Sequence, residues 1–351
     1  TVVDRVIQQA VAQILMKKLD SSFSESSYGF RPRRSAQMAV LKTLEYINEG
    51  YDWVIDLDIE AYFDTVNHDK LISILREKNV NDSTTLHLIR KFMQAGIMED
   101  GLVKPSRIGV PQGGPLSPII SNVYLDKFDK ELENRGLRFV RYADDCNIFV
   151  KSEMSANRVM KSVTSWLERK LFLKVSATKT KVVRPPESKF LGFTYLQRNG
   201  VWKCKPSNQS KMKLYDKCRK ELVRRIGIAR PIAVTFKRIN QIVVGWINYY
   251  RIGVMKYFVD VFGQWLRHKI RVMILKQWKK PKRIYINLQK LNNKLSCHFT
   301  DEQIFSVANS RLGLYRQACG HVVNFLLSPR ILAIKKKDRP GLVNPLNYYL
   351  S

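Results

Sequence analysis

What this 351-residue sequence lacks excludes several classes of protein. Its five cysteines are scattered and never spaced C-x-x-C, so neither a disulfide framework nor a zinc ribbon is indicated. Its five histidines show no H-x-x-x-H spacing of a metal site. No apolar run approaches the ~20 residues that cross a bilayer, and the opening residues read as an amphipathic helix rather than a signal peptide. We therefore expect a reducing, cytoplasmic setting and no membrane partner.

Acidic residues are scarce in the second part of the chain. Residues 201–351 hold 31 Lys and Arg against 6 Asp and Glu, whereas residues 1–200 hold 30 against 24. The net charge of +31 is thus concentrated beyond residue 200. A single basic helix would read as a solvated surface, but an excess sustained over many segments costs self-repulsion unless a polyanion neutralises it. Nucleic acid is the predicted partner, and its binding should depend strongly on salt.

Apolar periodicity predicts a mixed α and β structure for the first part. Helices are expected over residues 1–20, 35–49, 68–78, 83–96, 119–136 and 155–171. Strands are expected to begin at residues 51 and 189, and a hairpin is expected around residues 99–101. The stretch RYADDCNIFV, residues 141–150, reads as one buried strand.

Beyond residue 205 the pattern becomes helical. An apolar stripe recurs at spacings of three and four from Phe236 to Tyr250, and a second helix is expected over residues 256–278. Pro281 and the polar run 287–296 indicate a domain boundary. The short basic segments that follow carry no clear pattern.

Three aspartates stand within or at the ends of predicted strands. Asp58 closes the first strand, and Asp144 with Asp145 interrupts residues 141–150. Clustered carboxylates raise one another's pKa unless a cation joins them, and magnesium favours a few carboxylates together with substrate phosphates. The alternative is a solvent-facing Asp58 and a simple turn at Asp144. Either motif alone would favour that alternative, whereas their joint occurrence favours a metal site.

Six segments carry a resemblance to a known family. They are YADD (142–145), DLDIEAYFD (56–64), GVPQGGPLSPIISNVYLD (109–126), SYGFRPRRSA (27–36), KFLGFTY (189–195) and GWINYYRIG (245–253). Together they resemble group II intron reverse transcriptases, and the last resembles their maturase, or thumb, segment. One YxDD alone would be weak, but six blocks in the family's order are a specific signal.

The resemblance implies an α+β right-hand polymerase fold. Fingers and palm with an antiparallel sheet would cover residues 1–204. An α-helical thumb, or maturase X domain, would cover residues 205–285, and a small basic DNA-binding domain would cover residues 286–351. No zinc-type endonuclease segment is visible, as in the compact class C members. The family's basic fingers segment that would precede Thr1 is not in this sequence, so part of the fingers is expected to be missing.

The resemblance also implies a catalytic site. Asp58 and Asp144 would hold two Mg²⁺ ions, and the backbone carbonyl of Ile59 would be a further ligand. Asp145 would support the pair. Such a two-metal site activates a sugar hydroxyl and stabilises leaving pyrophosphate.

Contacts with the incoming deoxynucleotide triphosphate follow from the same resemblance. Phe63 would lie under the sugar and clash with a 2′-hydroxyl. Gln112 and Gly113 would lie under the templating pair, where a small residue allows close backbone approach. From the residues alone, core packing beside Tyr62 is the favoured interpretation of Phe63, and PQGGPLSP also reads as a rigid turn.

Three further residues are implied near the primer and the triphosphate. Ala143 is small enough to lie against the primer end. Lys179 would protonate departing pyrophosphate, although a solvated lysine is a comparable interpretation. Arg31 would contact the template or the triphosphate.

Basic residues on the predicted thumb helices would follow a duplex backbone. Phosphate contacts of this kind position a nucleic acid without reading its sequence, and an RNA–DNA hybrid would be gripped by its A-like shape. The same surface is expected to bind intron RNA. The predicted residues are Lys237, Arg238, Arg251, Arg267 and Arg271.

The implied function is RNA-directed DNA polymerisation for a group II intron in a bacterial cytoplasm. The protein would also bind intron RNA as a splicing maturase and assist retrohoming into a DNA target. Two alternatives stay open: a non-catalytic RNA-binding splicing factor, and a domesticated reverse transcriptase serving DNA repair or defence. The sequence leaves the oligomeric state open.

Overall fold

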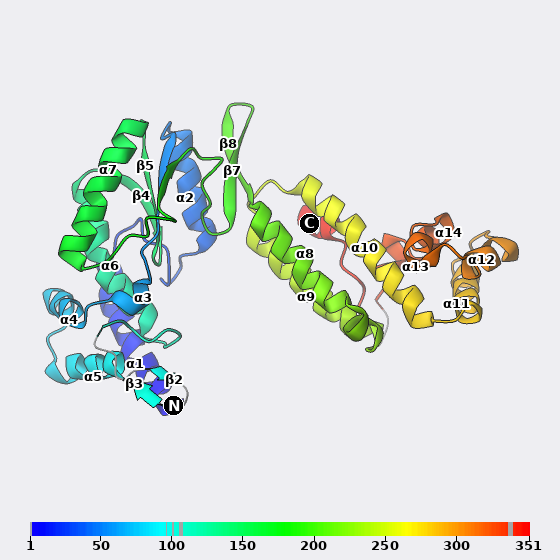
Figure 1. The fold of residues 1–351 in the computed structure, drawn as a ribbon, viewed down its shortest axis with the longest axis horizontal. Helices are drawn as coiled ribbons and strands as arrows, with labels where there is room; N and C mark the ends of the chain where they lie inside the picture. Colours follow the sequence, from blue (N-terminus) through cyan, green and yellow to red (C-terminus); the bar gives the residue numbers. More distant parts are fainter. Residues whose placement is uncertain (1, 96, 100–101, 105–107, 336–339) are drawn as a thin grey trace. The chain divides into compact units, whose positions relative to one another are not determined.

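A computed structural model of the chain describes residues 2–95, 97–99, 102–104, 108–335 and 340–351. They fold into two compact units, Thr1–Cys204 and Lys205–Ser351, described here in turn (Figure 1). The fold class is α+β with antiparallel sheets, as predicted. None of the described helices combines the length and the apolar character that crossing a bilayer requires.

The first unit is built on a four-stranded antiparallel sheet with strand order β4–β5–β1–β6. Its strands are β1 (Trp53–Leu57), β4 (Arg138–Tyr142), β5 (Asp145–Val150) and β6 (Lys181–Val183). The prediction of one strand over residues 141–150 is wrong. Ala143 adopts a left-handed conformation, with φ at 58°, and the chain turns back there to form the β4–β5 hairpin.

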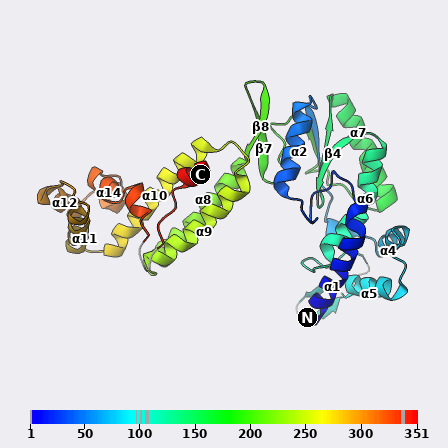
Figure 2. The same cartoon turned by 180° about the vertical axis from the view of Figure 1, so that it is seen from behind.

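Alternation of side chains gives the sheet two different faces. On one face, apolar residues of β1 and β5 join a hydrophobic core with α6 (Ser117–Asn134) and α7 (Glu153–Trp166). On the other face, Tyr46 of α2 (Ala36–Asn48) packs against Phe149, with ring centroids 5.5 Å apart. The sheet is therefore sandwiched between helices (Figures 1 and 2).

Several other elements of this unit lie where the periodicity predicted them. They are α1 (Val2–Leu19), α4 (His68–Glu77), α5 (Ser83–Gln94), the hairpin strands β2 (Ile97–Glu99) and β3 (Leu102–Lys104), η2 (Leu167–Leu171) and β7 (Phe193–Arg198). Three further elements were not predicted: η1 (Asp20–Ser22), α3 (Tyr62–Thr65) and β8 (Val201–Pro206), which pairs with β7 in a two-stranded sheet. Asn67 caps α4 by accepting from the Lys70 amide. The predicted hairpin tip at Asp100 and Gly101 lies outside the described residues.

The described part of the second unit is helical. Its elements are α8 (Asn208–Leu222), η3 (Arg224–Ile228), α9 (Ile232–Tyr250), α10 (Lys256–Trp278), α11 (Pro281–Lys294), α12 (Asp301–Ala308), α13 (Gly313–Gln317), α14 (His321–Leu326), α15 (Pro329–Leu332) and α16 (Pro345–Leu350). Phe236, Ile239 and Val243 of the predicted stripe are buried. These side chains form the packing face of α9.

The polar run 287–296 does not mark a break. Pro281 stands at the first position of α11, where a missing N–H costs nothing, and the helix continues to Lys294. Near the end of the chain, α16 packs against both α9 and α10. The division of this unit at residue 285 stays a prediction.

Candidate active site and nucleic-acid interface

The sheet register brings the predicted carboxylates to one place. In the β1–β5 pairing Leu57 lies opposite Cys146, so the next pair in register sets Asp58 opposite Asp145. Opposed residues on antiparallel strands have Cα atoms about 5 Å apart. Their side chains point to the same face of the sheet, the one that also carries Asp56. Asp144 immediately precedes Asp145 and lies in the turn between β4 and β5.

The turn that carries Asp144 is held against the loop of the SYGF motif. Tyr142 pairs with Asp145, which closes the turn over Ala143 and Asp144. A Cβ added at Gly29 would lie 2.3 Å from the Ala143 nitrogen. Only a glycine therefore allows these two backbones to approach so closely.

Two hydrogen bonds of its backbone hold Asp58 in place, while one of its side-chain oxygens accepts no hydrogen bond from the described residues. Its amide donates to Thr180 Oγ1 at 3.1 Å, and its carbonyl accepts from the Ser176 amide at 2.9 Å. The buried Asp58 Oδ2 accepts no hydrogen bond from any described residue. Lys179 Nζ lies 3.3 Å from this oxygen, on a side chain that is 70% exposed. The lysine can move away and leave Oδ2 to another cation.

Two carboxyl groups at this edge of the sheet, Asp145 and Asp56, are disfavoured in their ionised forms. Burial, followed by the charges of Asp144, Asp58 and Asp56, raises the pKa of Asp145 to about 6, although its side chain still reaches solvent. Burial also raises the pKa of Asp56 to about 6, against the hydrogen bond donated by Ser188. Repulsion of this kind is relieved by a bound cation.

The carboxylate and carbonyl oxygens at this sheet edge are the type of ligand that magnesium prefers. Across the described ranges, no three His, Cys, Asp or Glu side chains form a group that could hold a metal by themselves. Magnesium is commonly bound through one or two carboxylates completed by substrate phosphates and water, and an available Asp58 Oδ2 agrees with that mode. The bridge between Ile59 and Val175 is flanked by hydrogen bonds to the carbonyls of Asp58 and Lys174, and neither of these two bonds uses the Ile59 carbonyl.

Residues predicted to contact the nucleotide lie beside α3. Phe63 is half-buried, packing on Tyr62 with ring centroids 5.2 Å apart. Gln112 is exposed and donates to Asp64 Oδ1 at 3.4 Å, and Gly113 has a φ of 85° with no described atom within 4 Å of an added Cβ. The roles of Phe63, Gln112 and Gly113 stay predictions. The open space at Gly113 indicates that glycine is needed there for its backbone conformation.

Arg31 does not have the surroundings predicted for it. Its guanidinium is buried, and it donates to Asp20 Oδ1 at 2.7 Å, to Asp20 O at 2.8 Å and to Ser24 O at 2.5 Å. These donors already hold the loop together, which disfavours the expected contact with template or triphosphate, and that contact stays a prediction.

Sequence reasoning missed a buried ion pair beside the turn. Arg141 and Asp129 are each 0% exposed and lie 2.5 Å apart. Burial alone would lower the pKa of Arg141, but Asp129 outweighs it and the pKa is raised, so the guanidinium stays charged. The available signal was an arginine in the apolar strand LRFVRY, which needs a partner if that strand is buried.

In the second unit, the predicted basic residues differ in exposure. Lys237, Arg238 and Arg251 are exposed, and Arg267 is half-buried, which lowers its pKa. Arg271 is only 8% exposed, donating to Leu327 O at 3.0 Å and bonding the Asn324 side chain. Arg271 therefore does not lie on an exposed face, because its charge ties α10 to the α14 region. Its predicted phosphate contact is disfavoured by this burial and stays a prediction.

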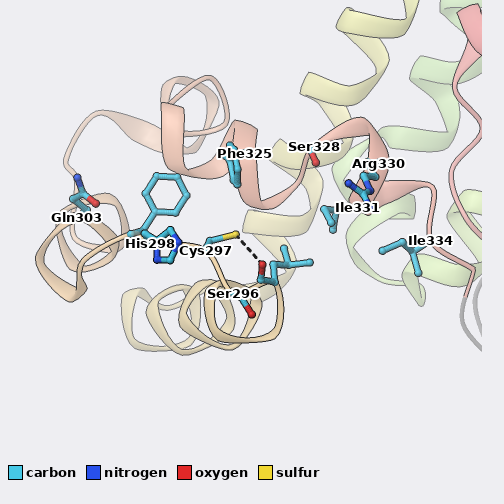
Figure 3. A pocket seen from close by; sticks show the side chains of 11 residues that line it. Ser296, Cys297, His298, Gln303, Phe325, Ser328, Arg330, Ile331 and Ile334 are labelled. Atoms are coloured by element: carbon cyan, nitrogen blue, oxygen red, sulfur yellow. Dashed lines mark hydrogen bonds between the residues drawn. The ribbon is translucent and has the colours of Figure 1, made fainter.

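A cavity of about 670 Å³ lies within the second unit (Figure 3). Apolar side chains such as Phe325, Ile331 and Ile334 line it together with His298 and Arg330. None of the predicted site residues lines it. Its lining carries no cluster of carboxylates, so the chemistry described above belongs to the sheet edge of the first unit.

Comparison with known families decides the identity. The family model "Reverse transcriptase (RNA-dependent DNA polymerase)" matches residues 1–195, and "Group II intron, maturase-specific domain" matches residues 211–291. The chain belongs to the group II intron reverse transcriptase/maturase family. Membership of the reverse transcriptase family implies use of a divalent metal.

Relatives of this reverse transcriptase/maturase come from several organisms. The chain is 30% identical to protein YkfC of Escherichia coli (strain K12), over 51% of the chain and 57% of YkfC. It is 38% identical to the group II intron-encoded protein LtrA of Lactococcus lactis subsp. cremoris, over 40% of the chain and 23% of LtrA. A telomerase structure from Candida tropicalis aligns with 98% of the chain and 60% of the telomerase chain, at 11% identity and a TM-score of 0.47.

Proposed function

We propose that the protein is an RNA-directed DNA polymerase that extends a DNA primer on an RNA template with deoxynucleotide triphosphates. The observation that carries this proposal is the register that sets Asp58 opposite Asp145, next to the turn with Asp144. The match of residues 1–195 to reverse transcriptases supports it. We further propose that the protein binds its intron RNA as a splicing maturase and assists retrohoming.

Each carboxylate has a distinct proposed task. Asp58 and Asp144 would hold two Mg²⁺ ions with the Ile59 carbonyl, and Asp145 would support them. When bound, the ions would activate the primer 3′-hydroxyl and neutralise charge on the leaving pyrophosphate. Lys179 is positioned beside Asp58 and is exposed enough to turn toward the departing group and donate a proton.

Substrate selection is proposed for residues around α3. The half-buried Phe63 would limit the room at the sugar 2′ position, and Ala143 would lie against the primer end. Gln112 and Gly113 would support the templating pair. The bond of Gln112 to Asp64 and the left-handed φ of Gly113 give this loop a defined conformation, which such a role requires.

The decisive experiment is primer extension on an RNA template by Asp144→Asn. Loss of one ligand charge should lower the rate by about 1,000-fold or more, since several kcal/mol of charge stabilisation are removed. Asp69→Asn is the matched control, because Asp69 is an exposed aspartate paired with Arg90. Synthesis by Asp144→Asn at the rate of this control would reject the polymerase assignment.

A non-catalytic splicing factor is the second candidate. The excess of 31 basic over 6 acidic residues in 201–351 and the maturase-specific match favour RNA binding independent of polymerisation. Splicing stimulation by a wild-type protein that does not extend primers would support this candidate. Stimulation that survives Asp144→Asn alongside wild-type extension would mean that both functions exist and use different residues.

A further inference from the structure

Arg141 links three segments of the first unit by hydrogen bonds. Its Nε donates to Asp129 Oδ1 at 2.6 Å on α6, and Nη2 donates to Ser27 Oγ at 2.8 Å in the SYGF loop. Its Nη1 donates to the carbonyl of Ala143 at 2.8 Å. The last bond reaches the backbone of the turn that carries Asp144.

Asn122 completes this connection from α6. Its Oδ1 accepts from Arg141 Nη1 at 3.2 Å, while its Nδ2 donates to the carbonyl of Gly29 at 2.9 Å. Gly29 is the residue whose added Cβ would meet the Ala143 nitrogen. The loop and the turn are therefore held on both sides by one buried polar network.

The Arg141 side chain lies on the far side of the sheet from the carboxylates. In the β4–β5 pairing Arg141 lies opposite Cys146, whereas Tyr142 lies opposite Asp145. Neighbouring residues on a strand point to opposite faces. Arg141 thus faces α6, away from Asp58 and Asp145. Its direct hydrogen-bonded link to the turn that carries Asp144 is the bond to the Ala143 carbonyl.

Stability alone does not account for this pair. Taking two charges out of water costs several kcal/mol per ion, and apolar residues of similar volume often stabilise a core as well or better. A directed donor is needed, however, to fix a non-glycine residue in a left-handed turn, a conformation that costs about 1–2 kcal/mol. The bond from Nη1 to the Ala143 carbonyl provides that donor.

We propose that Arg141, held by Asp129 and Asn122, is a positioning residue that fixes the Ala143–Asp144 turn and thereby sets the position of Asp144 relative to Asp58. This inference rests on the proposed polymerase function for its kinetic consequence. Its structural consequence, an ordered turn, holds independently of activity.

The kinetic test compares Arg141→Lys and Asn122→Ala with Asp126→Asn. Asp126 is a matched control because it is also a buried carboxylate on α6, paired with Lys78 at 2.5 Å and accepting from the Ser24 amide. Both network variants should lower kcat by about tenfold or more with KM for the deoxynucleotide within about threefold, as expected for a misplaced catalytic group. Asp126→Asn should lower stability but keep kcat within about twofold.

Hydrogen–deuterium exchange gives the second readout. The peptide covering Tyr142–Cys146 should exchange faster in Asn122→Ala and Arg141→Lys, and at the wild-type rate in Asp126→Asn. Asn122→Ala keeps the ion pair between Arg141 and Asp129, so this variant tests the positioning role if Arg141→Lys does not fold. The inference is overturned if the Tyr142–Cys146 peptide exchanges at the wild-type rate in a folded Arg141→Lys or Asn122→Ala variant. It is also overturned if the kcat of such a variant equals that of Asp126→Asn. A wild type that never extends primers rejects the proposed function alone, because the exchange result still stands.

Discussion

Aspartates two residues apart in the sequence have different surroundings at the sheet edge. Asp56 is enclosed by Ser188 and the following backbone, and its carboxyl group has a pKa raised to about 6 by burial. The Oδ2 atom of Asp58 instead accepts no hydrogen bond from the described residues, and it lies beside the exposed end of Lys179. Asp56 is therefore a structural carboxyl group, and Asp58 is the one able to accept a cation.

Asp56→Asn should stabilise the protein at high pH. A carboxyl group with a raised pKa makes folding less favourable once it ionises, so wild-type stability falls as pH rises from about 4 through 6. The amide cannot ionise and still accepts from Ser188. We expect a gain of about 2 kcal/mol in the free energy of unfolding at pH 8, and none at pH 4, measured by urea denaturation.

Asp52→Asn provides the control at the start of the same strand. The Asp52 side chain is 48% exposed and lies 3.8 Å from Arg184. It should show no gain at either pH. A pH-independent effect of Asp56→Asn would contradict the assigned cause.

At the scale of elements, the candidate active site is assembled by a close contact between a loop and a hairpin turn. The SYGF loop bonds β4 through the Tyr28 amide and the Arg141 carbonyl at 2.8 Å. Phe30 extends the contact, with its ring centroid 6.3 Å from that of Tyr142. The strand hairpin alone therefore does not define the position of Asp144.

Gly29→Ala should displace the turn more than it unfolds the protein. The new Cβ would lie 2.3 Å from the Ala143 nitrogen, a backbone atom that cannot rotate away. We expect primer extension to fall by about tenfold or more with a loss of about 1–3 kcal/mol in stability. Activity and thermal unfolding measured on one preparation separate the two effects.

Gly245→Ala is the matched control for this substitution. Gly245 lies in α9, and no described atom is within 4 Å of its added Cβ. Alanine should leave activity unchanged and raise stability by up to about 1 kcal/mol, since it is the better helix former. An equal loss of activity in both variants would contradict the proposed contact.

At the scale of the whole molecule, charge and chemistry are divided between the two units. The carboxylate site lies within the first unit, whereas residues 201–351 carry most of the excess of basic residues. The match of residues 211–291 to the maturase-specific domain falls in the second unit. This division favours a positively charged nucleic-acid surface that acts by phosphate contact rather than by base reading.

Neutralising Lys237, Arg238 and Arg251 to Gln should weaken RNA binding uniformly across sequences. Each lost phosphate contact should reduce the slope of log K against log salt concentration by about 1. Fluorescence anisotropy over a salt series measures both affinity and slope. An unchanged slope would mean that these exposed side chains do not reach phosphates.

Arg271→Gln distinguishes local contact from net charge. It removes one positive charge, but this guanidinium is buried against Leu327 and Asn324. It should therefore lower thermal stability and leave the salt slope as it is. A slope reduced as much as by one of the exposed substitutions would mean that net charge governs binding.

The outline of the fold was predictable because its signals are local. Helix periodicity placed α9 and α10, and the spacing of the carboxylate motifs indicated a shared site before any strand pairing was known. The turn between β4 and β5 was only the alternative interpretation of the sequence, for a physical reason. Ala143 takes a left-handed φ without the glycine or asparagine that usually marks such a turn.

The sequence by itself determined the class of the protein, the concentration of positive charge beyond residue 200, and the residue types able to hold magnesium. Only the tertiary structure decided which charges are available. Arg31 and Arg271 are basic residues like Lys237, but burial and internal hydrogen bonds occupy them. Availability depends on neighbours from distant segments, and no local pattern of residue types contains that information.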